Sequence, residues 1–423
     1  MSDNLKGSKR MITHQESDKD VTLERRESIE SGNPGERSIP GPPRVAVIVI
    51  SDLQFGGAQR QVVELCNRMD PQRYEMHIVS LAEYVPLSRT LKHAGSRLYT
   101  ISKKNKWDFT VAFQLARLLR KLKADVVQGY LFDACVAARI AGKLAGTRLV
   151  VDSERNCLGT FKKRHHLAYR ATRSFVDIVV ANSSAGADFN HREFGLEKSR
   201  YRVVHNGVDT DRFTRGNSAE LRRKLGWDEG DLVVGMFASF KRQKNHQLLL
   251  KAAPEILKKF PNARIALVGD ELYQGRDGSG ELKKSIEREI ERIGMNDRFL
   301  FMGNRDDVDQ IYGACDLTVL PSLHEGTPNV ALESMASGVP VVATKVADNE
   351  FVIPDGRVGY LVDLDDHAAL AERISCLLED HALRRKLGEQ ARAWVLEEFS
   401  CQRLADKTAD VFDQALRMQS FRP

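Results

Sequence analysis

The sequence predicts an α/β fold built from two doubly wound domains with parallel sheets, and three observations support this prediction. The chain has 423 residues, which is too long for one ordinary hydrophobic core. From residue 44 onward, apolar segments of strand length alternate with amphipathic helical segments, as in Rossmann-like domains. A second series of the same kind begins near residue 232, so the two halves of the chain share one organisation.

These patterns divide the chain into four segments. Residues 1–43 are rich in Ser, Glu, Arg, Lys, Gly and Pro and poor in aliphatic residues, so we expect a disordered tail. We expect a first domain over residues 44–206 and a second over residues 207–400, each Rossmann-like. A C-terminal helix is expected over residues 401–423, and in two-domain chains such a helix can cross back to the first domain.

In the first domain, VAVIVIS is predicted to be a buried strand, AQRQVVELCNRM an amphipathic helix and YEMHIVSL the next strand. The alternation continues with a helix around residues 112–122 and with strands at residues 126–128, 149–152, 178–181 and 202–204.

In the second domain, a strand at residues 232–240 is followed by a helix with Asn245 as its predicted N-cap. That helix covers residues 246–260, and the series continues with a strand at 264–268, a helix at 281–293 and strands at 299–302 and 317–320. After residue 361 the chain is predicted to be helical to its end.

Charge and cysteine content exclude several classes of protein. A formal charge of +6 is modest for this length, and no nucleic-acid-binding module is visible, so no nucleic acid partner is expected. The six cysteines include no C-x-x-C pair, which argues against a disulfide framework and a structural zinc. No segment resembles a signal peptide or a membrane span, so we expect a cytoplasmic protein.

One basic cluster is dense, formed by Lys162, Lys163, Arg164, His165 and His166. It has few interleaved aromatic residues. A solvated face is the first interpretation, and a contact with an acceptor or a membrane is the second.

The stretch EGTPNVALE places Glu325 and Glu333 around the start of one predicted helix, with Thr327 as its N-cap and Pro328 at the first helical position. It follows an apolar strand, and in parallel sheets ligands bind where strands end. The alternative is structural, because glutamates near a helix start are common and offset the helix dipole.

Two other loops follow the first strand of each domain. Gly56 and Gly57 allow positive φ angles and close approach of a ligand, although a tight turn is an equally good interpretation. Lys241, Arg242 and Lys244 lie beside a helix start, where three cations suit a diphosphate. A solubilising basic turn is the alternative.

Asp209 and Asp211 form an Asp-x-Asp string of the kind that can hold a divalent ion. They follow HNGV at the domain junction and not a buried strand end, so turn and capping roles are favoured. No metal is assigned.

Taken together, these strings resemble the retaining GT-B glycosyltransferases of the family-four, glycosyl transferases group 1, type. The most specific string is PSLHEGTPNVALESMASGVPVVAT, supported in order by ISDLQFGGAQR, DSERN, VVHNGVD, KRQKNHQLLLKA and RVGYLV. The resemblance covers residues 44–400 and implies two facing Rossmann-like domains, with the acceptor on the first and a nucleotide sugar in the second.

The resemblance also implies roles for single residues. Glu325 would contact the donor hexose, and backbone groups around Gly326 and Thr327 would approach its hydroxyls or the phosphate. Glu333 would bind the ribose hydroxyls, and Lys244 would neutralise the departing diphosphate.

Around the glycine loop, Gly56 and Gly57 would approach both the donor phosphate and the acceptor.

One departure from the family concerns Ser239, which stands where an arginine is usual, and Lys241 or Arg242 is expected to supply that charge.

A second departure is Tyr130, which replaces the usual active-site histidine. Asp133, one turn further on, is the polar candidate for the acceptor side.

The expected activity is transfer of a hexose from a UDP- or GDP-sugar to an acceptor hydroxyl with retention, in polysaccharide or glycolipid biosynthesis. No cofactor is expected, since the nucleotide sugar is a co-substrate, and no metal is required. Expected partners are this donor, a glycan or lipid-linked acceptor, and an anionic membrane contacted peripherally at its inner face. A non-catalytic nucleotide-sugar-binding protein of the same fold is the alternative, motivated by Ser239 and Tyr130.

Overall fold

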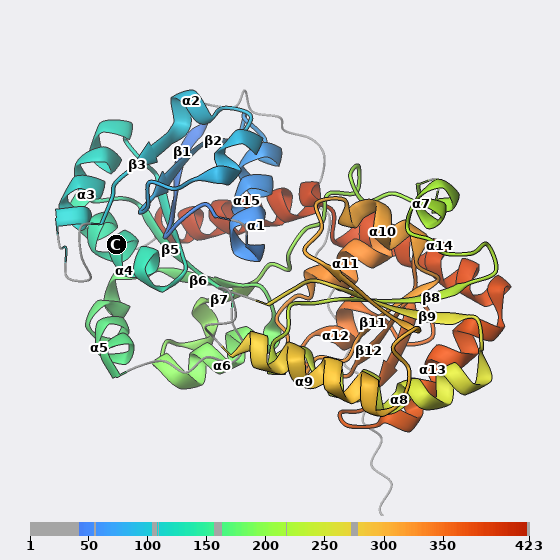
Figure 1. The fold of residues 1–423 in the computed structure, drawn as a ribbon. Helices are drawn as coiled ribbons and strands as arrows, with labels where there is room; N and C mark the ends of the chain where they lie inside the picture. Colours follow the sequence, from blue (N-terminus) through green and yellow to red (C-terminus); the bar gives the residue numbers. More distant parts are fainter. Residues whose placement is uncertain are drawn as a thin grey trace, which may run out of the picture. The chain divides into compact units, whose positions relative to one another are not determined.

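A computed structural model of the chain describes residues 42–54, 56–103, 108, 110–155, 163–216, 218–271 and 278–420. The disordered tail predicted over residues 1–43 lies outside the described residues, except for its last two positions. The described chain contains two parallel sheets, one in each predicted domain (Figure 1).

The first sheet has seven strands in the order β3-β2-β1-β4-β5-β6-β7, and all neighbours are parallel. Its strands are β1 (Arg44–Ile50), β2 (Tyr74–Ser80), β3 (Leu98–Thr100), β4 (Val126–Tyr130), β5 (Leu149–Glu154), β6 (Ile178–Ala181) and β7 (Tyr201–Val203). The helices of this half are α1 (Gly57–Arg68), α2 (Ala94–Arg97), α3 (Thr110–Leu122), α4 (Phe132–Ala145), α5 (Lys163–Thr172) and α6 (Ser184–Phe194), with short 3-10 turns η1 (Pro86–Thr90), η2 (Arg173–Phe175) and η3 (Lys198–Arg200).

Strand β1 shows why this sheet is covered on both faces. Ile48 and Ile50 pack into one buried cluster, and Val47 and Val49 pack into another. Alternate residues of a strand point to opposite faces, so an uninterrupted apolar run requires helices on both sides. The predicted doubly wound organisation is confirmed.

The second sheet has six strands in the order β10-β9-β8-β11-β12-β13, again all parallel. Its strands are β8 (Leu232–Phe237), β9 (Ala263–Val268), β10 (Phe299–Gly303), β11 (Leu317–Leu320), β12 (Val341–Thr344) and β13 (Gly359–Val362). The helices are α7 (Ser218–Lys224), α8 (His246–Lys259), α9 (Ser279–Arg292), α10 (Val308–Ala314), α11 (Asn329–Ala336), α12 (Asn349–Val352), α13 (His367–Glu379) and α14 (His381–Glu398), with one 3-10 turn, η4 (Arg242–Lys244).

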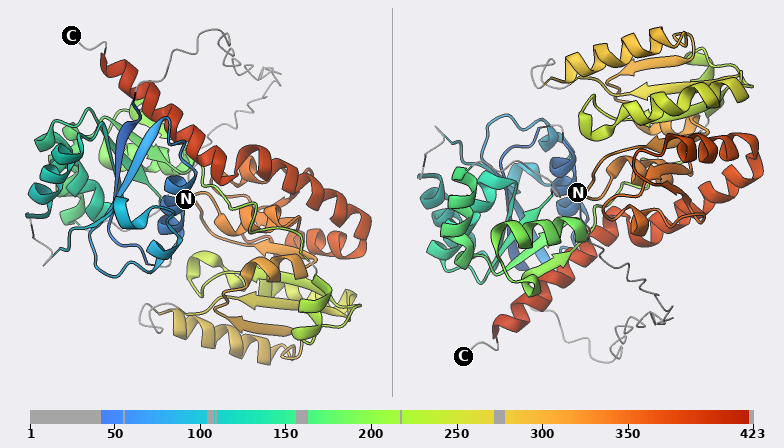
Figure 2. Two further views of the ribbon diagram at one scale, coloured as in Figure 1. Left: turned by 90° about the horizontal axis from the view of Figure 1, so that it is seen from above. Right: turned by 90° about the horizontal axis from the view of Figure 1, so that it is seen from below.

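The last helix, α15 (Cys401–Ser420), follows the second domain but packs on the first (Figures 1 and 2). Leu404 and Phe412 are buried in the same cluster as Ile48 of β1. The Phe412 ring meets the Tyr74 ring edge-on at 5.5 Å, and the Tyr74 hydroxyl donates to Asp413 at 2.6 Å. The predicted return of the terminal helix is therefore confirmed.

Two further findings concern the whole described chain. None of its helices combines the length and the apolar character that a bilayer-crossing helix requires. Its cysteines Cys66, Cys135, Cys315, Cys376 and Cys401 are free thiols.

Candidate functional site

Each sheet has a switch point, where two neighbouring central strands lead into loops on opposite sides. In the second sheet these strands are β8 and β11, and in the first they are β1 and β4. Ligands of open α/β sheets bind outside the carboxyl ends of such strands. The loops at residues 238–245 and 321–328 therefore form the first candidate site.

The loop after β8 carries three cations on a tightly held backbone. Gln243 donates from its side chain to the carbonyl of His324 at 2.8 Å, and the Leu323 N–H donates to the Gln243 carbonyl at 2.8 Å. Lys241 and Arg242 are exposed, and neither side chain has a hydrogen bond or ion pair with another described residue. Both charges are thus available on a fixed loop.

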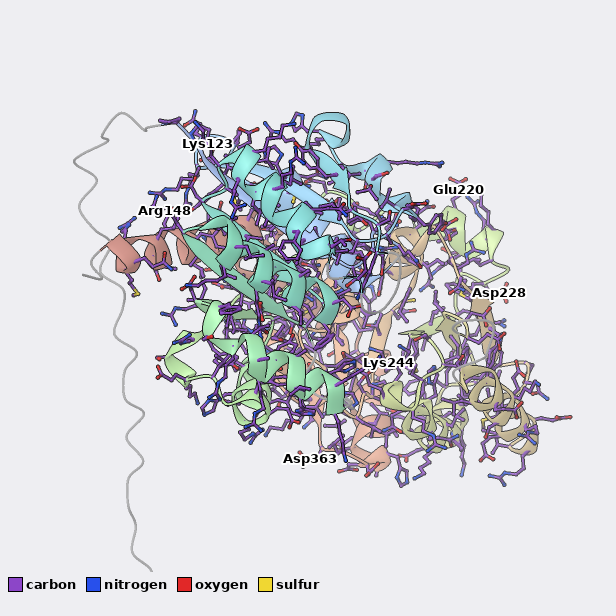
Figure 3. All side chains as sticks on the ribbon, turned by 90° about the vertical axis from the view of Figure 1, so that its left-hand side faces the viewer. Lys123, Arg148, Glu220, Asp228, Lys244 and Asp363 are labelled. Carbon is purple, nitrogen blue, oxygen red and sulfur yellow. The ribbon has the colours of Figure 1, made fainter. Side chains whose placement is uncertain are left out.

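Lys244 and Glu325 meet at this switch point, as their positions after neighbouring strands predict. The Lys244 Nζ donates to Glu325 Oε1 at 2.7 Å, and the two side chains are 18% and 8% exposed. Figure 3 labels Lys244 on the second domain. Such a partly buried pair fixes the ammonium group in place, because a buried carboxylate needs its partner.

Asn245 stands at the N-cap position of α8, as predicted, but with a φ of 51° and without a side-chain capping bond. Its buried Nδ2 has no hydrogen-bond partner among the described residues, and neither does the buried Ser322 Oγ on the opposite loop. Buried polar atoms are normally satisfied, so these two groups fit a site that is completed by a polar ligand.

The predicted N-cap role of Thr327 is wrong. Helix α11 begins at Asn329 with Pro328 at the cap position, and no side chain caps it. The Thr327 hydroxyl instead donates to the Asn182 carbonyl and accepts from the Asn206 N–H at 3.3 Å. Tertiary partners in the first domain therefore outcompete the local cap.

Gly326 lies beside the same asparagine. A Cβ atom at Gly326 would be 2.9 Å from both Nδ2 and Oδ1 of Asn182, closer than real Cβ contacts allow. Glycine at this position thus permits close contact between the loop after β11 and the loop after β6.

Glu333 faces a cavity of about 550 Å³ that residues of both domains line, among them Arg60, Arg68, Arg305 and Asn329. Its Oε2 accepts a hydrogen bond from the buried Tyr312 hydroxyl at 3.0 Å. Burial raises the pKa of Glu333, while the Tyr312 bond and the charge of Arg60 oppose that rise. Glu325 and Lys244 are not among the residues that line this cavity.

The glycine loop differs from its prediction. Gly56 has a φ of −165°, which is ordinary extended backbone, and Gly57 is not among the glycines with positive φ. Instead, a Cβ at Gly57 would lie 3.0 Å from the Asn329 side chain. Close approach to the second domain, and not positive φ, is what the structure supports for Gly57.

Tyr130 lies at the end of β4 and is 1% exposed, so its ring cannot touch an acceptor in this structure. Burial raises the pKa of its hydroxyl. The guanidinium of Arg155 covers the ring at 4.8 Å and donates to Asn206 at 2.6 Å. Asn206 donates in turn to Asn329 at 2.7 Å, which links the first domain to α11.

Leu131, the next residue, has φ 70° and ψ 159°, a backbone conformation that is normally confined to glycine. Asp133 follows in the first turn of α4, is half exposed and pairs with Lys103 at 3.3 Å. It lines a mostly apolar cavity of about 280 Å³ together with Phe132, Arg164 and His165. The acceptor-side prediction is thus compatible with Asp133 but not with direct contact by Tyr130.

The basic cluster is described only in part, because Lys162 lies outside the described residues. Lys163, Arg164, His165 and His166 begin α5, and Arg164 Nε contacts His165 Nε2 at 3.2 Å.

Asp209 caps its own turn, accepting from the N–H groups of Asp211 at 3.1 Å and Arg212 at 3.3 Å. Both aspartates also pair with Arg68 at 3.3 Å. These contacts confirm the turn and capping interpretation.

At Ser239, the position of the first departure, the backbone carbonyl accepts a hydrogen bond from the Lys241 N–H at 2.8 Å. In the loop after β10, Gly303 has a φ of 62° and Arg305 pairs with Asp307 through two bonds of 2.8 and 2.7 Å.

Sequence reasoning missed one contact between the domains. Asp348 accepts from the Ser184 N–H at 2.7 Å, from the Ala185 N–H at 3.1 Å and from His205 at 2.9 Å. Burial alone would raise the pKa of Asp348, but these hydrogen bonds outweigh it and the pKa is lowered. The only signal for this contact in the sequence was the string VVHNGVD, which contains His205.

Two family models match the chain. The model described as Glycosyltransferase Family 4 matches residues 55–212, and the model described as Glycosyl transferases group 1 matches residues 217–394.

Individual proteins give the same result. The chain is 24% identical over 373 residues to N-acetyl-alpha-D-glucosaminyl L-malate synthase of Bacillus anthracis, covering 86% of this chain and 95% of that protein. It is 25% identical over 318 residues to UDP-Gal:alpha-D-GlcNAc-diphosphoundecaprenol alpha-1,3-galactosyltransferase of Escherichia coli, covering 72% and 79%. Among solved structures, Anabaena HepE in complex with UDP has a TM-score of 0.76 at 22% identity, over 88% of this chain and 100% of that one, which shows the shared fold.

Proposed function

The chain belongs to the GT-B glycosyltransferases of family 4, and on this premise we propose that it moves a hexose from a nucleotide sugar to an acceptor hydroxyl with retention at the anomeric carbon. The observation that carries the proposal is the Lys244–Glu325 pair at the switch point of the second sheet, flanked by the exposed cations Lys241 and Arg242.

Stabilisation of the leaving group is the main catalytic effect in this proposal. The departing nucleoside diphosphate gains negative charge, and preorganised cations lower the energy of that charge without rearranging. Lys244 supplies the held ammonium group, while Lys241 and Arg242 supply the charge of the arginine that Ser239 replaces. Family members are thought to use a donor phosphate oxygen to take the acceptor proton. No side-chain base is then needed, so the burial of Tyr130 does not remove a required catalytic group.

The two glutamates have separate roles in this proposal. Glu325 positions Lys244 and contacts the hexose, with Gly326 and Thr327 offering backbone groups nearby. Glu333 binds the ribose hydroxyls from the 550 Å³ cavity, because within the described ranges its Oε1 has no hydrogen-bond donor. Carboxylate oxygens are suited to accept from hydroxyls.

A UDP-sugar is the first donor to test. The E. coli relative is named for UDP-Gal and the HepE structure is a complex with UDP, whereas the sequence by itself left UDP and GDP open.

We also propose a glycan or lipid-linked acceptor and a peripheral contact with an anionic membrane, on the cytoplasmic side. Leu167 on α5 and Phe113 on α3 are 71% and 65% exposed, and the basic residues of α5 lie beside Leu167. Flotation with vesicles of 30% anionic lipid tests the contact, and Leu167→Ser should reduce binding. Equal flotation with neutral vesicles would contradict it.

No metal is required in the proposed mechanism, because Asp209 and Asp211 are engaged by Arg68 and by their own turn. EDTA should leave transfer unchanged. Strict dependence on an added divalent ion would contradict this.

The decisive experiment compares Lys244→Ala and Lys244→Gln in a transfer assay with UDP-sugars and glycan acceptors. Loss of the charge should lower kcat/KM by about 10² to 10³, the usual effect of removing one preorganised group. The glutamine keeps a donor for Glu325, so it separates lost charge from lost positioning.

The exposed Lys251→Ala on α8 is the matched control and should transfer like the parent. If both Lys244 variants and Glu325→Ala also transfer at the parent rate, the assigned site is wrong. Saturable donor binding without turnover on any acceptor would favour the non-catalytic binding protein.

A further inference from the structure

One cavity of the second domain lies at the opposite end of its sheet from the candidate donor site. It has a volume of about 680 Å³, and its lining includes Leu232, Asp316 and Pro340. Leu232 begins β8, Asp316 directly precedes β11 and Pro340 directly precedes β12. The donor loops follow the carboxyl ends of β8 and β11, so this cavity marks the amino ends. Lys244 and Asp228, which neighbours the cavity residues Trp227 and Glu229, are clearly separated in Figure 3.

Arginines dominate the lining of this cavity, with five of them present: Arg215, Arg222, Arg223, Arg384 and Arg385, together with His381. Its carboxylates are Glu229, Asp231 and Asp316. Two of these are already neutralised, since Asp231 pairs with Arg264 at 2.5 Å and Asp316 pairs with two arginines. Glu229 is exposed.

Arg222 and Arg384 are held in fixed positions in the lining of this cavity. They hold the two oxygens of Asp316 at 2.7 and 3.3 Å. Arg222 also donates to the carbonyls of Ala314 and Asp231, and Arg384 donates to two carbonyls at the end of α13. Arg384 is 8% exposed, so these guanidinium groups are built into the domain and are not solubilising surface charges.

Arg215 and Arg223 differ from these two fixed arginines. Both are exposed, and neither forms a hydrogen bond or ion pair with another residue of the described ranges. Trp227 lines the same cavity, is 4% exposed, and its indole N–H likewise has no described hydrogen-bond partner. Two arginines without a described hydrogen-bond or ion-pair partner and a buried tryptophan therefore line the same cavity.

We propose that this cavity is a second anion site, which binds a phosphate ester such as a phosphorylated sugar. Guanidinium groups match the oxygens of phosphate in a bidentate manner, and the fixed cations below raise the local potential. The volume lies in the usual range for small-molecule sites and exceeds what inorganic phosphate needs, so the ligand carries an organic part beside Trp227. The proposal does not depend on the reaction at Lys244.

Calorimetric titration with inorganic phosphate, at constant ionic strength set with chloride, tests the site on the full chain. Lys244→Ala should keep the phosphate binding that depends on Arg215 and Arg223, because Lys244 belongs to the other end of the sheet. Arg215→Ala/Arg223→Ala should weaken binding at least about tenfold, the lower limit for losing a charge-assisted contact. Arg89→Ala/Arg117→Ala removes two exposed arginines elsewhere and should bind like the parent.

Three results would overturn the proposal: no saturable binding by the parent, loss of binding in Lys244→Ala alone, or equal loss in the control double variant. Circular dichroism checks folding, and the milder Arg223→Gln replaces the double variant if that variant is unfolded. Transfer by Arg215→Ala/Arg223→Ala without phosphate should equal the parent rate, so failure of this site and failure of the proposed reaction are distinguishable.

Discussion

The two sheets share one strand order around their central strands but differ in what they place at the switch point. In the second sheet, Lys244 and Glu325 meet beside two exposed cations. In the first, Tyr130 is buried under Arg155, and Leu131 has a backbone conformation normally confined to glycine. The same topology therefore places accessible charges at the switch point of one domain and a packed contact surface at that of the other.

Buried charge differs between the domains in the same way. Arg139 and Asp152 of the first domain form an ion pair that is wholly buried, and Glu154 lies next to it. The Lys244–Glu325 pair remains partly open to solvent. The Arg139–Asp152 pair thus serves the scaffold, whereas the Lys244–Glu325 pair is accessible to a ligand.

The strongest test of this contrast is Arg139→Ala. It leaves Asp152 buried without its cation, which should cost about 3 to 5 kcal/mol of unfolding free energy. Urea unfolding followed by circular dichroism measures the loss, and the exposed Arg117→Ala is the control. A loss below about 1 kcal/mol would show that this pair is not part of the scaffold.

Next in expected size is the pH dependence of Glu154. Burial, then the charge of Asp152, raises its pKa to about 7 from an ordinary 4.5. The folded state holds this proton more tightly, so the stabilisation is complete below pH 4.5 and is lost as the pH rises to about 7.

Glu154→Gln should therefore raise the unfolding free energy at pH 8 by up to about 3 kcal/mol, and with it the melting temperature, and have little effect at pH 4.5. Thermal melts of both proteins across this range provide the measurement. A stabilisation that is equal at both pH values would contradict a titrating Glu154.

Gly326→Ala tests the contact between the loop after β11 and the loop after β6. The added Cβ would force the Asn182 side chain to move, at a cost of about 1 to 3 kcal/mol for overpacking. Melting temperature and kcat/KM should both fall. Gly95→Ala, where a Cβ meets nothing within 4 Å, is the matched control, and identical behaviour of the two variants would count against the close contact.

The smallest expected effect is that of Glu333→Gln. The amide keeps an acceptor for Tyr312 but removes the charge that should bind ribose hydroxyls, so UDP should bind about tenfold more weakly, or about 1.4 kcal/mol. Calorimetry with UDP measures this, with the exposed Glu281→Gln as control. An unchanged affinity for UDP would show that Glu333 does not bind the donor.

Much of this architecture was predictable from local patterns. Apolar runs located β1, β2, β8 and β11, and the position of charged loops after β8 and β11 predicted that Lys244 and Glu325 come together. The periodicity of strands and the rule that ligands bind at strand ends require no knowledge of distant contacts.

What sequence could not predict depends on partners far away along the chain. Thr327 looked like a helix cap because its partners, Asn182 and Asn206, are about 120 to 145 positions away. Paired glycines suggested positive φ at Gly57, whereas close approach to Asn329 is the actual constraint. The edge strand β3 has only three residues, too few to show a period.

Helix α15 has a consequence for synthesis. It supplies Leu404 and Phe412 to the core of the first domain, although more than 190 residues separate it from β7. At usual translation rates, the ribosome needs roughly 10 to 40 s to make the intervening chain. During that interval the core cluster that Leu404 and Phe412 complete is partly uncovered, so the domain that is made first reaches its final packing only after the second has emerged.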